Sequence, residues 1–231
     1  MQQETRKIQI TQDTRVSSVF ALPDGYPSSR DTAVILAHGA GNGMDHPFIS
    51  HFHRAFAEAG LLSVKFNFPY MESGRKAPDR MPLLETTWRA VIRAVREDSE
   101  WAPRHLYLAG KSMGGRVASH VVSQGEACSG LIFLGYPLHP ARQADRRRVA
   151  HWSGLSCPVL FVQGTRDALC DLNILESELP KIQSGAALHI IEGGDHSFKT
   201  PKSSGKSAED IWTDVNSAIV SWVKKITDGE S

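Results

Sequence analysis

Residues 105–122 read HLYLAGKSMGGRVASHVV, and this stretch decides the fold class. Its opening, His105 to Ala109, is mostly apolar and predicts a buried strand, and the end of the stretch, through Val122, predicts a helix. Between them, Gly110-Lys111-Ser112-Met113-Gly114 matches the pattern G-x-S-x-G. In a strand–turn–helix context this pattern is typical of a nucleophile elbow, where glycines at its two ends, here Gly110 and Gly114, allow a sharp turn that exposes the serine hydroxyl. The stretch therefore predicts an α/β fold with Ser112 as its candidate nucleophile.

Strands and helices alternate on both sides of this stretch. Segments rich in β-branched and aromatic residues predict strands, and segments with apolar residues three and four apart predict helices. The other predicted strands are Lys7 to Thr11, Val16 to Leu22, Ala33 to Ala37, Leu62 to Phe68, Leu131 to Leu134, Val159 to Val162 and Leu188 to Ile191. The other predicted helices are Phe48 to Ala59, Leu83 to Val95, Leu172 to Leu179 and Asp210 to Ile226. This order predicts a leading hairpin and then a mostly parallel sheet between two helical layers, a three-layer α/β/α sandwich. Three segments predict mobile connections: Met71 to Met81, Leu138 to Ser153 and Thr200 to Ser207.

The composition is that of an ordinary globular protein. The chain has 231 residues, 41% of them hydrophobic and 22% charged, with a formal net charge of +1. We therefore expect one domain over residues 1–231 and no nucleic-acid partner. The three cysteines, Cys128, Cys157 and Cys170, have no regular spacing, so neither a disulfide framework nor a zinc site is expected. No other cofactor is expected either, because the chemistry suggested by the motifs below needs only side chains and backbone amides.

The sequence gives no sign of a membrane partner. Met1 to Lys7 lacks the apolar region of a signal peptide, and no run of about 18 apolar residues could span a bilayer. We expect a cytoplasmic protein, and the sequence leaves its oligomeric state open.

The candidate acid and base that would act with Ser112 follow later predicted strands. A serine hydroxyl needs a base to take its proton, and in folds with this elbow the chain order is serine, acid, histidine. Asp167 follows the predicted strand at Val159 to Val162, and His196 follows the predicted strand at Leu188 to Ile191. Ligands of such sheets bind at the carboxyl ends of the strands, so we predict that Ser112, Asp167 and His196 form a catalytic triad. The rival acids are Asp171, expected inside the following helix, and Asp195, whose position next to His196 makes it a poor partner for the ring.

The glycine-rich run after the strand Ala33 to Ala37 is the candidate partner of the elbow. An oxyanion needs two backbone N–H donors, one from the residue after the nucleophile and one from an early loop. We predict Met113 as the first donor and Ala40 as the second, with Gly41 as the alternative.

Competing interpretations of polar segments are weaker. A phosphate-binding loop ending at Lys111-Ser112 would need a glycine where His105 stands. Along the basic stretch Arg142 to Arg148 we expect solvated side chains, although the stretch could attract an anionic substrate. The histidines His139 and His151 are also expected to be solvated, whereas His189 is expected to be structural within its strand.

Several segments together resemble the α/β-hydrolase superfamily over nearly the whole chain. The resemblance is greatest to the small dienelactone-hydrolase-like and testis-expressed-protein-thirty-like hydrolases. The segments that carry it are LAHGAGNGMDHPF, FNFPYMESGRKAPD, GKSMGGRVAS, FLGYPLHP, VQGTRDALC and GGDHSF. The resemblance implies the same triad and an eight-stranded sheet whose second strand is antiparallel. Larger members insert a helical cap after the sixth strand, and Leu138 to Pro158 is too short for one, so we expect no cap domain.

Two classes of function are compatible with these features. The leading hypothesis is a serine hydrolase that cleaves carboxylic esters or thioesters, with amides and lactones open as other substrates. The open site favours short acyl groups of a small-molecule substrate. The alternative is a catalytically silent interaction module on a hydrolase scaffold, because a fold does not fix a function.

Overall fold

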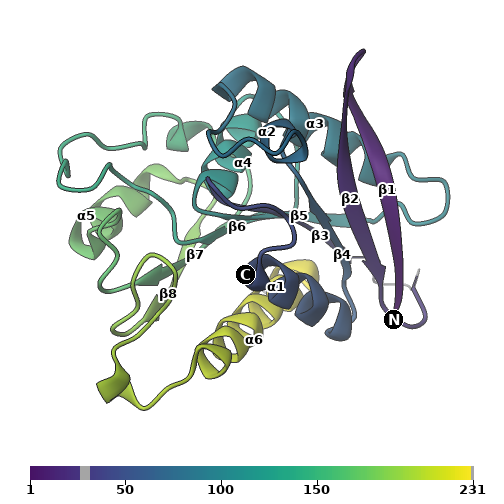
Figure 1. Cartoon of the computed structure of the whole chain (residues 1–231). Coiled ribbons are helices and arrows are strands. Elements are labelled where there is room, and N and C mark those ends of the chain that lie inside the picture. Colours follow the sequence, from purple (N-terminus) through teal and green to yellow (C-terminus); the bar gives the residue numbers. More distant parts are fainter. Residues whose placement is uncertain (27–31, 230–231) are drawn as a thin grey trace.

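The computed structural model describes residues 1–26 and 32–229 (Figure 1). The strands are β1 (Gln2–Thr11), β2 (Thr14–Leu22), β3 (Thr32–Ala37), β4 (Leu62–Phe66), β5 (His105–Lys111), β6 (Gly130–Leu134), β7 (Val159–Gly164) and β8 (Ala186–Ile191). The α-helices are α1 (Pro47–Glu58), α2 (Pro69–Glu72), α3 (Met81–Arg96), α4 (Met113–Ser123), α5 (Leu172–Glu178) and α6 (Ala208–Thr227). Three short 3-10 turns, η1 (Trp152–Gly154), η2 (Leu179–Lys181) and η3 (Lys202–Ser204), lie in the connections.

All eight of these strands form one sheet in the order β1-β2-β4-β3-β5-β6-β7-β8. Strand β2 runs antiparallel to both β1 and β4, and every pairing from β4 through β8 is parallel. The mostly parallel sheet and its antiparallel second strand are therefore confirmed. Parallel strands carry their carboxyl ends to one edge of the sheet, and that edge positions the candidate site.

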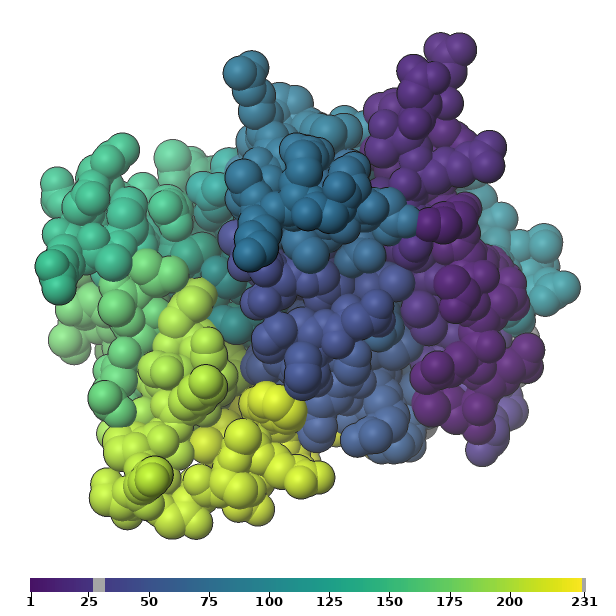
Figure 2. Space-filling view, viewed as in Figure 1, coloured from purple at the N-terminus to yellow at the C-terminus, as the bar shows by residue number. Residues whose placement is uncertain are grey.

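Helices cover both faces of the sheet, so the predicted three layers are confirmed (Figure 1). Along β3, Val34 and Leu36 face a core that α1 and α6 complete, whereas Ala33 and Ile35 face the core formed with α3 and α4. Side chains that alternate between two apolar layers explain why β3 is an unbroken hydrophobic run. The space-filling view shows the C-terminal helix, in yellow, against the blue segment that contains α1 (Figure 2).

The connection between β6 and β7 is folded against the body of the protein, without a cap. Trp152 in η1 is fully buried and packs against Tyr136 and Phe161, with ring centroids 5.3 Å apart in both pairs. The Trp152 indole N–H also donates to the Tyr136 hydroxyl at 3.3 Å. This anchor holds most of the connection close to α4 and leaves no chain to build a helical cap.

The expectation that His139 and His151 are solvated is wrong. His139 is 5% exposed, and its Nε2 accepts the Asp171 N–H at 3.1 Å. His151 Nε2 lies 2.7 Å from Ser119 Oγ, and its ring stacks on His120 at 4.0 Å. The burial of Trp152 explains why His151 is not solvated, because it holds the preceding residue, His151, against α4.

The other expectations from the sequence agree more closely with the structure. His189 lies in β8 with Nε2 3.1 Å from Asp214 Oδ2, which fits a structural role. The sequence predicts only a connection over Met71 to Met81, but α2 extends into this segment and α3 starts at Met81. Asp79 supports this turn, since its Oδ2 accepts the Tyr70 N–H at 2.8 Å. Within the described part of the chain, no helix is both long and apolar enough to cross a membrane.

Burial keeps several histidines neutral. It lowers the pKa of His38 to about 4 and, together with the charge of Lys65, that of His53 to about 3. Burial is also the main cause that lowers the pKa of His151 to about 4, and the nearby charges of His120 and Arg116 lower it further. Each lowered pKa means that the folded state takes up a proton less readily than the unfolded state does.

We expect the protein to lose stability as the pH falls from about 6.5 towards 4. Over this range the unfolded chain protonates histidines that remain neutral in the folded state, so the contribution that is complete above about pH 6.5 is progressively lost. The free energy of unfolding in urea should fall between pH 7 and pH 5 by on the order of 1–2 kcal/mol for each of His38 and His53. The variant His53→Gln should show a shallower dependence on pH, because it removes one of the histidines whose pKa is lowered by folding. An equal free energy of unfolding at both pH values would contradict this account.

Candidate active site

Ser112 occupies the sharp turn between β5 and α4. Its φ is 50° and its ψ is −113°, a backbone conformation that side chains other than glycine rarely adopt. The positions around it must be glycine, because a side chain there would clash with neighbouring backbone. A Cβ on Gly110 would lie 2.2 Å from the Gly115 nitrogen, and one on Gly114 would lie 2.7 Å from the His38 carbonyl oxygen. The turn therefore holds the Ser112 hydroxyl at the carboxyl edge of the sheet.

Three side chains from separate strand ends form a hydrogen-bonded chain. His196 Nε2 lies 2.8 Å from Ser112 Oγ, and His196 Nδ1 lies 2.7 Å from Asp167 Oδ2. The Asp167 side chain is fully buried. An imidazole placed in this way can accept the hydroxyl proton while the carboxylate fixes its tautomer. The structure thus brings together the three side chains that the sequence singled out.

Two further hydrogen bonds hold the Asp167 carboxylate in place. Gln163 Nε2 donates to Oδ2 at 2.5 Å, and the Leu169 N–H donates to Oδ1 at 2.8 Å. Gln163 is fully buried near the end of β7, and its own Oε1 accepts the Tyr136 N–H at 2.9 Å. Sequence reasoning missed Gln163, since nothing in its local pattern distinguishes it from any other polar residue in a strand.

The two rival acids serve the backbone around them. Asp171 lies before α5 rather than inside it, and its Oδ1 accepts the N–H groups of Asn173 and Ile174 as an N-cap. Asp195 Oδ1 accepts the N–H groups of Ser197 and Lys199, which shapes the turn that carries His196. Neither carboxylate is the partner of the His196 ring in this structure.

The loop after β3 is fixed by His38. This side chain is fully buried, and its Nε2 accepts the Phe68 N–H at 3.1 Å. With Nε2 as acceptor, Nδ1 carries the proton and donates to the Gly39 carbonyl at 2.8 Å. The Tyr70 hydroxyl donates to the same carbonyl at 3.2 Å. These contacts hold the glycine-rich loop beside the elbow without any regular secondary structure.

A cavity of about 330 Å³ opens at Ser112. Its described lining includes Ala40 and Met113, the two expected oxyanion donors, but not the alternative Gly41. One side is apolar, with Met81, Leu84 and Leu169. The remaining lining residues are Pro78, Asp79, Arg116, Pro137 and Arg148.

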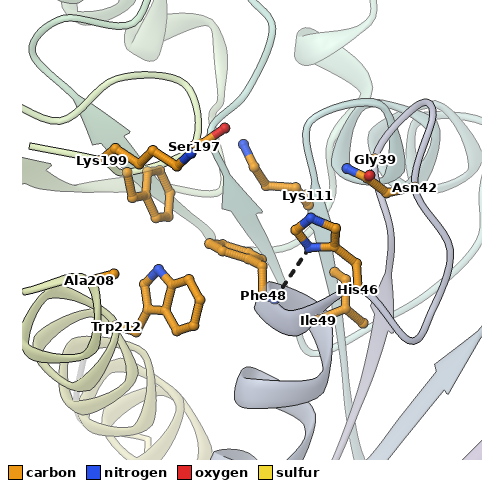
Figure 3. A pocket seen from close by; sticks show the side chains of 11 residues that line it. Gly39, Asn42, His46, Phe48, Ile49, Lys111, Ser197, Lys199, Ala208 and Trp212 are labelled. Carbon is orange, nitrogen blue, oxygen red and sulfur yellow. Dashed lines mark hydrogen bonds between the residues drawn. The ribbon is translucent and has the colours of Figure 1, made fainter.

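A second cavity, of about 160 Å³, is lined by Gly39 and by residues of α1 and α6, among them Phe48 and Trp212 (Figure 3). Lys111 extends into it between aromatic side chains, with Nζ 5.2 Å from the centre of the Phe198 ring and 5.8 Å from that of Phe48. Lys111 Nζ also donates to the His196 carbonyl. Burial lowers the pKa of this ammonium to about 8, although the nearby carboxylate of Asp167 favours its charged form.

Lys111 therefore links the elbow to the turn that carries His196. Sequence reasoning considered it only as part of a phosphate-binding loop. Its place directly before Ser112 was a signal that it could contact the site.

The expectation of a wholly solvated basic stretch is wrong for its last member. Arg148 is half-buried, and its Nη1 donates to the Pro137 carbonyl at 3.2 Å, whereas Arg142, Arg146 and Arg147 are exposed. The packing of the connection around Trp152 draws its end inwards. Across residues 1–26 and 32–229, no cluster of three histidine, cysteine, aspartate or glutamate side chains is arranged to hold a metal ion.

Comparison with known proteins assigns the family. A family model described as an alpha/beta hydrolase domain matches residues 30–224. A serine hydrolase without a lid from Xanthomonas campestris shares 20% identity at a TM-score of 0.73, over 96% of this chain and 94% of that one. An alpha-beta serine hydrolase homologue from Coxiella burnetii shares 20% identity at a TM-score of 0.72, over 94% of this chain and 95% of that one. Dienelactone hydrolase from Anabaena variabilis shares 18% identity at a TM-score of 0.72, over 96% of each chain. These solved structures share the fold, and because the family model spans most of its length, the chain belongs to the alpha/beta-hydrolase superfamily.

Proposed function

We propose that this hydrolase cleaves carboxylic esters or thioesters with Ser112 as its nucleophile, and that residues 1–231 form a single catalytic domain. The observation that carries the proposal is the unbroken hydrogen-bonded chain from Ser112 Oγ through His196 to the buried Asp167. The family and the esterase and serine hydrolase neighbours support hydrolase activity in general. The specific chemistry follows from the three side chains.

The reaction would proceed through an acyl-enzyme. Ser112 Oγ attacks the substrate carbonyl carbon while His196 Nε2 takes the hydroxyl proton. The resulting oxyanion is bound by the backbone N–H groups of Met113 and Ala40, with the N-terminus of α4 favouring the negative charge. His196 then gives its proton to the departing alcohol or thiol. Water repeats the sequence on the acyl-enzyme and releases the acid.

Replacing the nucleophile tests the proposal directly. Ser112→Ala should lower kcat/KM for p-nitrophenyl butyrate at least about 10³-fold, because alanine lacks the hydroxyl that would form the acyl-enzyme. A fluorophosphonate probe should label the wild-type protein and leave Ser112→Ala unlabelled. The matched control is Ser221→Ala on the exposed face of α6, which should keep both activity and labelling. Near-normal turnover by folded Ser112→Ala would contradict the assignment, and a wild-type protein that neither reacts with the probe nor turns over esters would favour a silent interaction module.

Isosteric changes at the three aspartates test the acid. Asp167→Asn should lower kcat about 10³–10⁴-fold, since His196 loses the carboxylate that sets its tautomer and stabilises its charged form. Asp171→Asn and Asp195→Asn should change kcat less than about tenfold, because asparagine keeps the oxygen that accepts the local backbone N–H groups. Steady-state rates and urea unfolding of all three variants decide the question. A larger loss of kcat from either control at unchanged stability would move the acid to that position.

The cavity at Ser112 favours short acyl groups. Its volume of about 330 Å³ suits a small acyl chain, and the β6–β7 connection supplies no cap to bury a longer one. A methylene that stays in water gains none of the ~0.8 kcal/mol that its burial would give. For neutral p-nitrophenyl esters at pH 8, kcat/KM should therefore be greatest between acetate and hexanoate. A steady increase up to dodecanoate would reveal a longer apolar channel.

A further inference from the structure

Two arginines line the cavity that contains Ser112. Arg116 lies one helical turn along α4, where its N–H donates to the Ser112 carbonyl at 3.1 Å. Arg148 comes from the β6–β7 connection and lines the same cavity. Both side chains are half-buried. Two arginines from separate elements thus line the cavity beside the nucleophile, and they are close enough for the charge of one to act on the other.

The position of Arg148 is built into the fold. Its Nη1 donates to the Pro137 carbonyl at 3.2 Å, and its own carbonyl accepts the Tyr136 hydroxyl at 2.9 Å. Tyr136 is fully buried beneath it. Partial burial, and then the positive charge of Arg116, lower the pKa of Arg148. The fold therefore holds two like charges near one another instead of separating them.

No carboxylate within residues 1–26 and 32–229 forms an ion pair with either arginine. The neighbouring Arg147, by contrast, pairs with Glu178. Asp79 lines the same cavity, but it pairs with Arg75 at 2.6 Å. Two half-buried cations without an acidic partner cost free energy unless an anion binds between them. The arrangement is that of a receptor for an anionic group.

The lining of the cavity indicates that it receives the acyl group of a substrate. Its lining includes both expected oxyanion donors, Ala40 and Met113, but neither His196 nor the residues directly after it. The leaving group must reach His196 to receive its proton, so it lies towards that ring. The acyl group then extends into the cavity, towards the arginines.

We propose that Arg116 and Arg148 bind a carboxylate at the far end of the acyl group, so that the substrates are half-esters or half-thioesters of short dicarboxylic acids. The inference rests on the proposed hydrolase function and specifies its substrate class. The planar guanidinium suits a carboxylate because it can donate two parallel hydrogen bonds. In a small cavity without a cap, this charge recognition supplies the specificity that apolar burial cannot.

A matched pair of substrates tests the proposal. One is p-nitrophenyl hemiadipate, and the other is the neutral ester in which an isopropyl group replaces its terminal carboxylate. The wild-type protein should prefer the hemiadipate in kcat/KM by roughly tenfold or more, since charge-assisted hydrogen bonds outweigh the matching apolar contact. Arg116→Met and Arg148→Met should each lower this preference roughly 10- to 100-fold. Arg148→Lys, which keeps the charge, should retain part of it.

The matched control is Arg146→Met. Arg146 is exposed and hydrogen-bonded to the Gln143 side chain, so the same loss of charge two residues from Arg148 should leave the preference intact. A second pair, para-carboxyphenyl acetate and its methyl ester, places the charge on the leaving group. Its ratio should not respond to either arginine variant. Urea unfolding of each variant ensures that the rates compare folded proteins.

The outcomes separate this inference from the proposed function. Turnover that requires Ser112 but shows no preference for the hemiadipate would overturn the carboxylate subsite alone. A preference that survives both arginine variants would overturn it as well, and an effect confined to the leaving-group pair would overturn the acyl assignment. Absence of turnover with all four esters would overturn both proposals.

Discussion

The close approach of α4 to the end of β3 is the constraint on which the site depends. No Cβ fits at Gly114 against the His38 carbonyl, or at Gly110 against the backbone of the helix. With glycine at these places, the chain turns sharply enough to hold Ser112 at a φ of 50° and to start the helix directly after it. The same approach places the loop after β3 beside the nucleophile. One steric requirement thus determines the position of the hydroxyl, the helix N-terminus and the candidate oxyanion loop.

Additional hydrogen bonds make this edge of the sheet rigid. Gln163 holds the Asp167 carboxylate from within β7, and Lys111 holds the His196 carbonyl from the elbow. His38 fixes the Gly39 carbonyl from the third side. Hydrogen bonds of this kind are stronger where water is excluded, and leaving them unmade there is costly. The functional side chains therefore need little reorganisation before a reaction.

The shape and the charge of the Ser112 cavity are related. Because η1 anchors the β6–β7 connection through Trp152, this connection cannot form a cap over the site. The same packing brings Arg148 inwards, where it meets Arg116 of α4. The lack of a cap limits how much apolar surface a substrate can bury, while the arginines supply charge recognition over a short distance. The packing of this one connection thus determines both the lack of a cap and the position of Arg148.

The sequence by itself determined the sheet, the elbow and the candidate triad, because each depends on local patterns. Ser112, Asp167 and His196 all follow predicted strands, and a parallel sheet brings such positions to one edge whatever their distance in sequence. Only the tertiary structure decided which polar residues of the connections are buried. His139 and Arg148 lie in a segment without periodicity. His139 is buried against the loop after β7, where its N–H donates to the Leu169 carbonyl and its Nε2 accepts the Asp171 N–H, whereas the place of Arg148 depends on how the connection packs around Trp152 and Tyr136. The tertiary structure also decided which groups Gln163 and Lys111 contact. Gln163 lies four residues before Asp167 and Lys111 lies next to Ser112, but hydrophobic periodicity does not reveal the hydrogen-bond partner of either side chain.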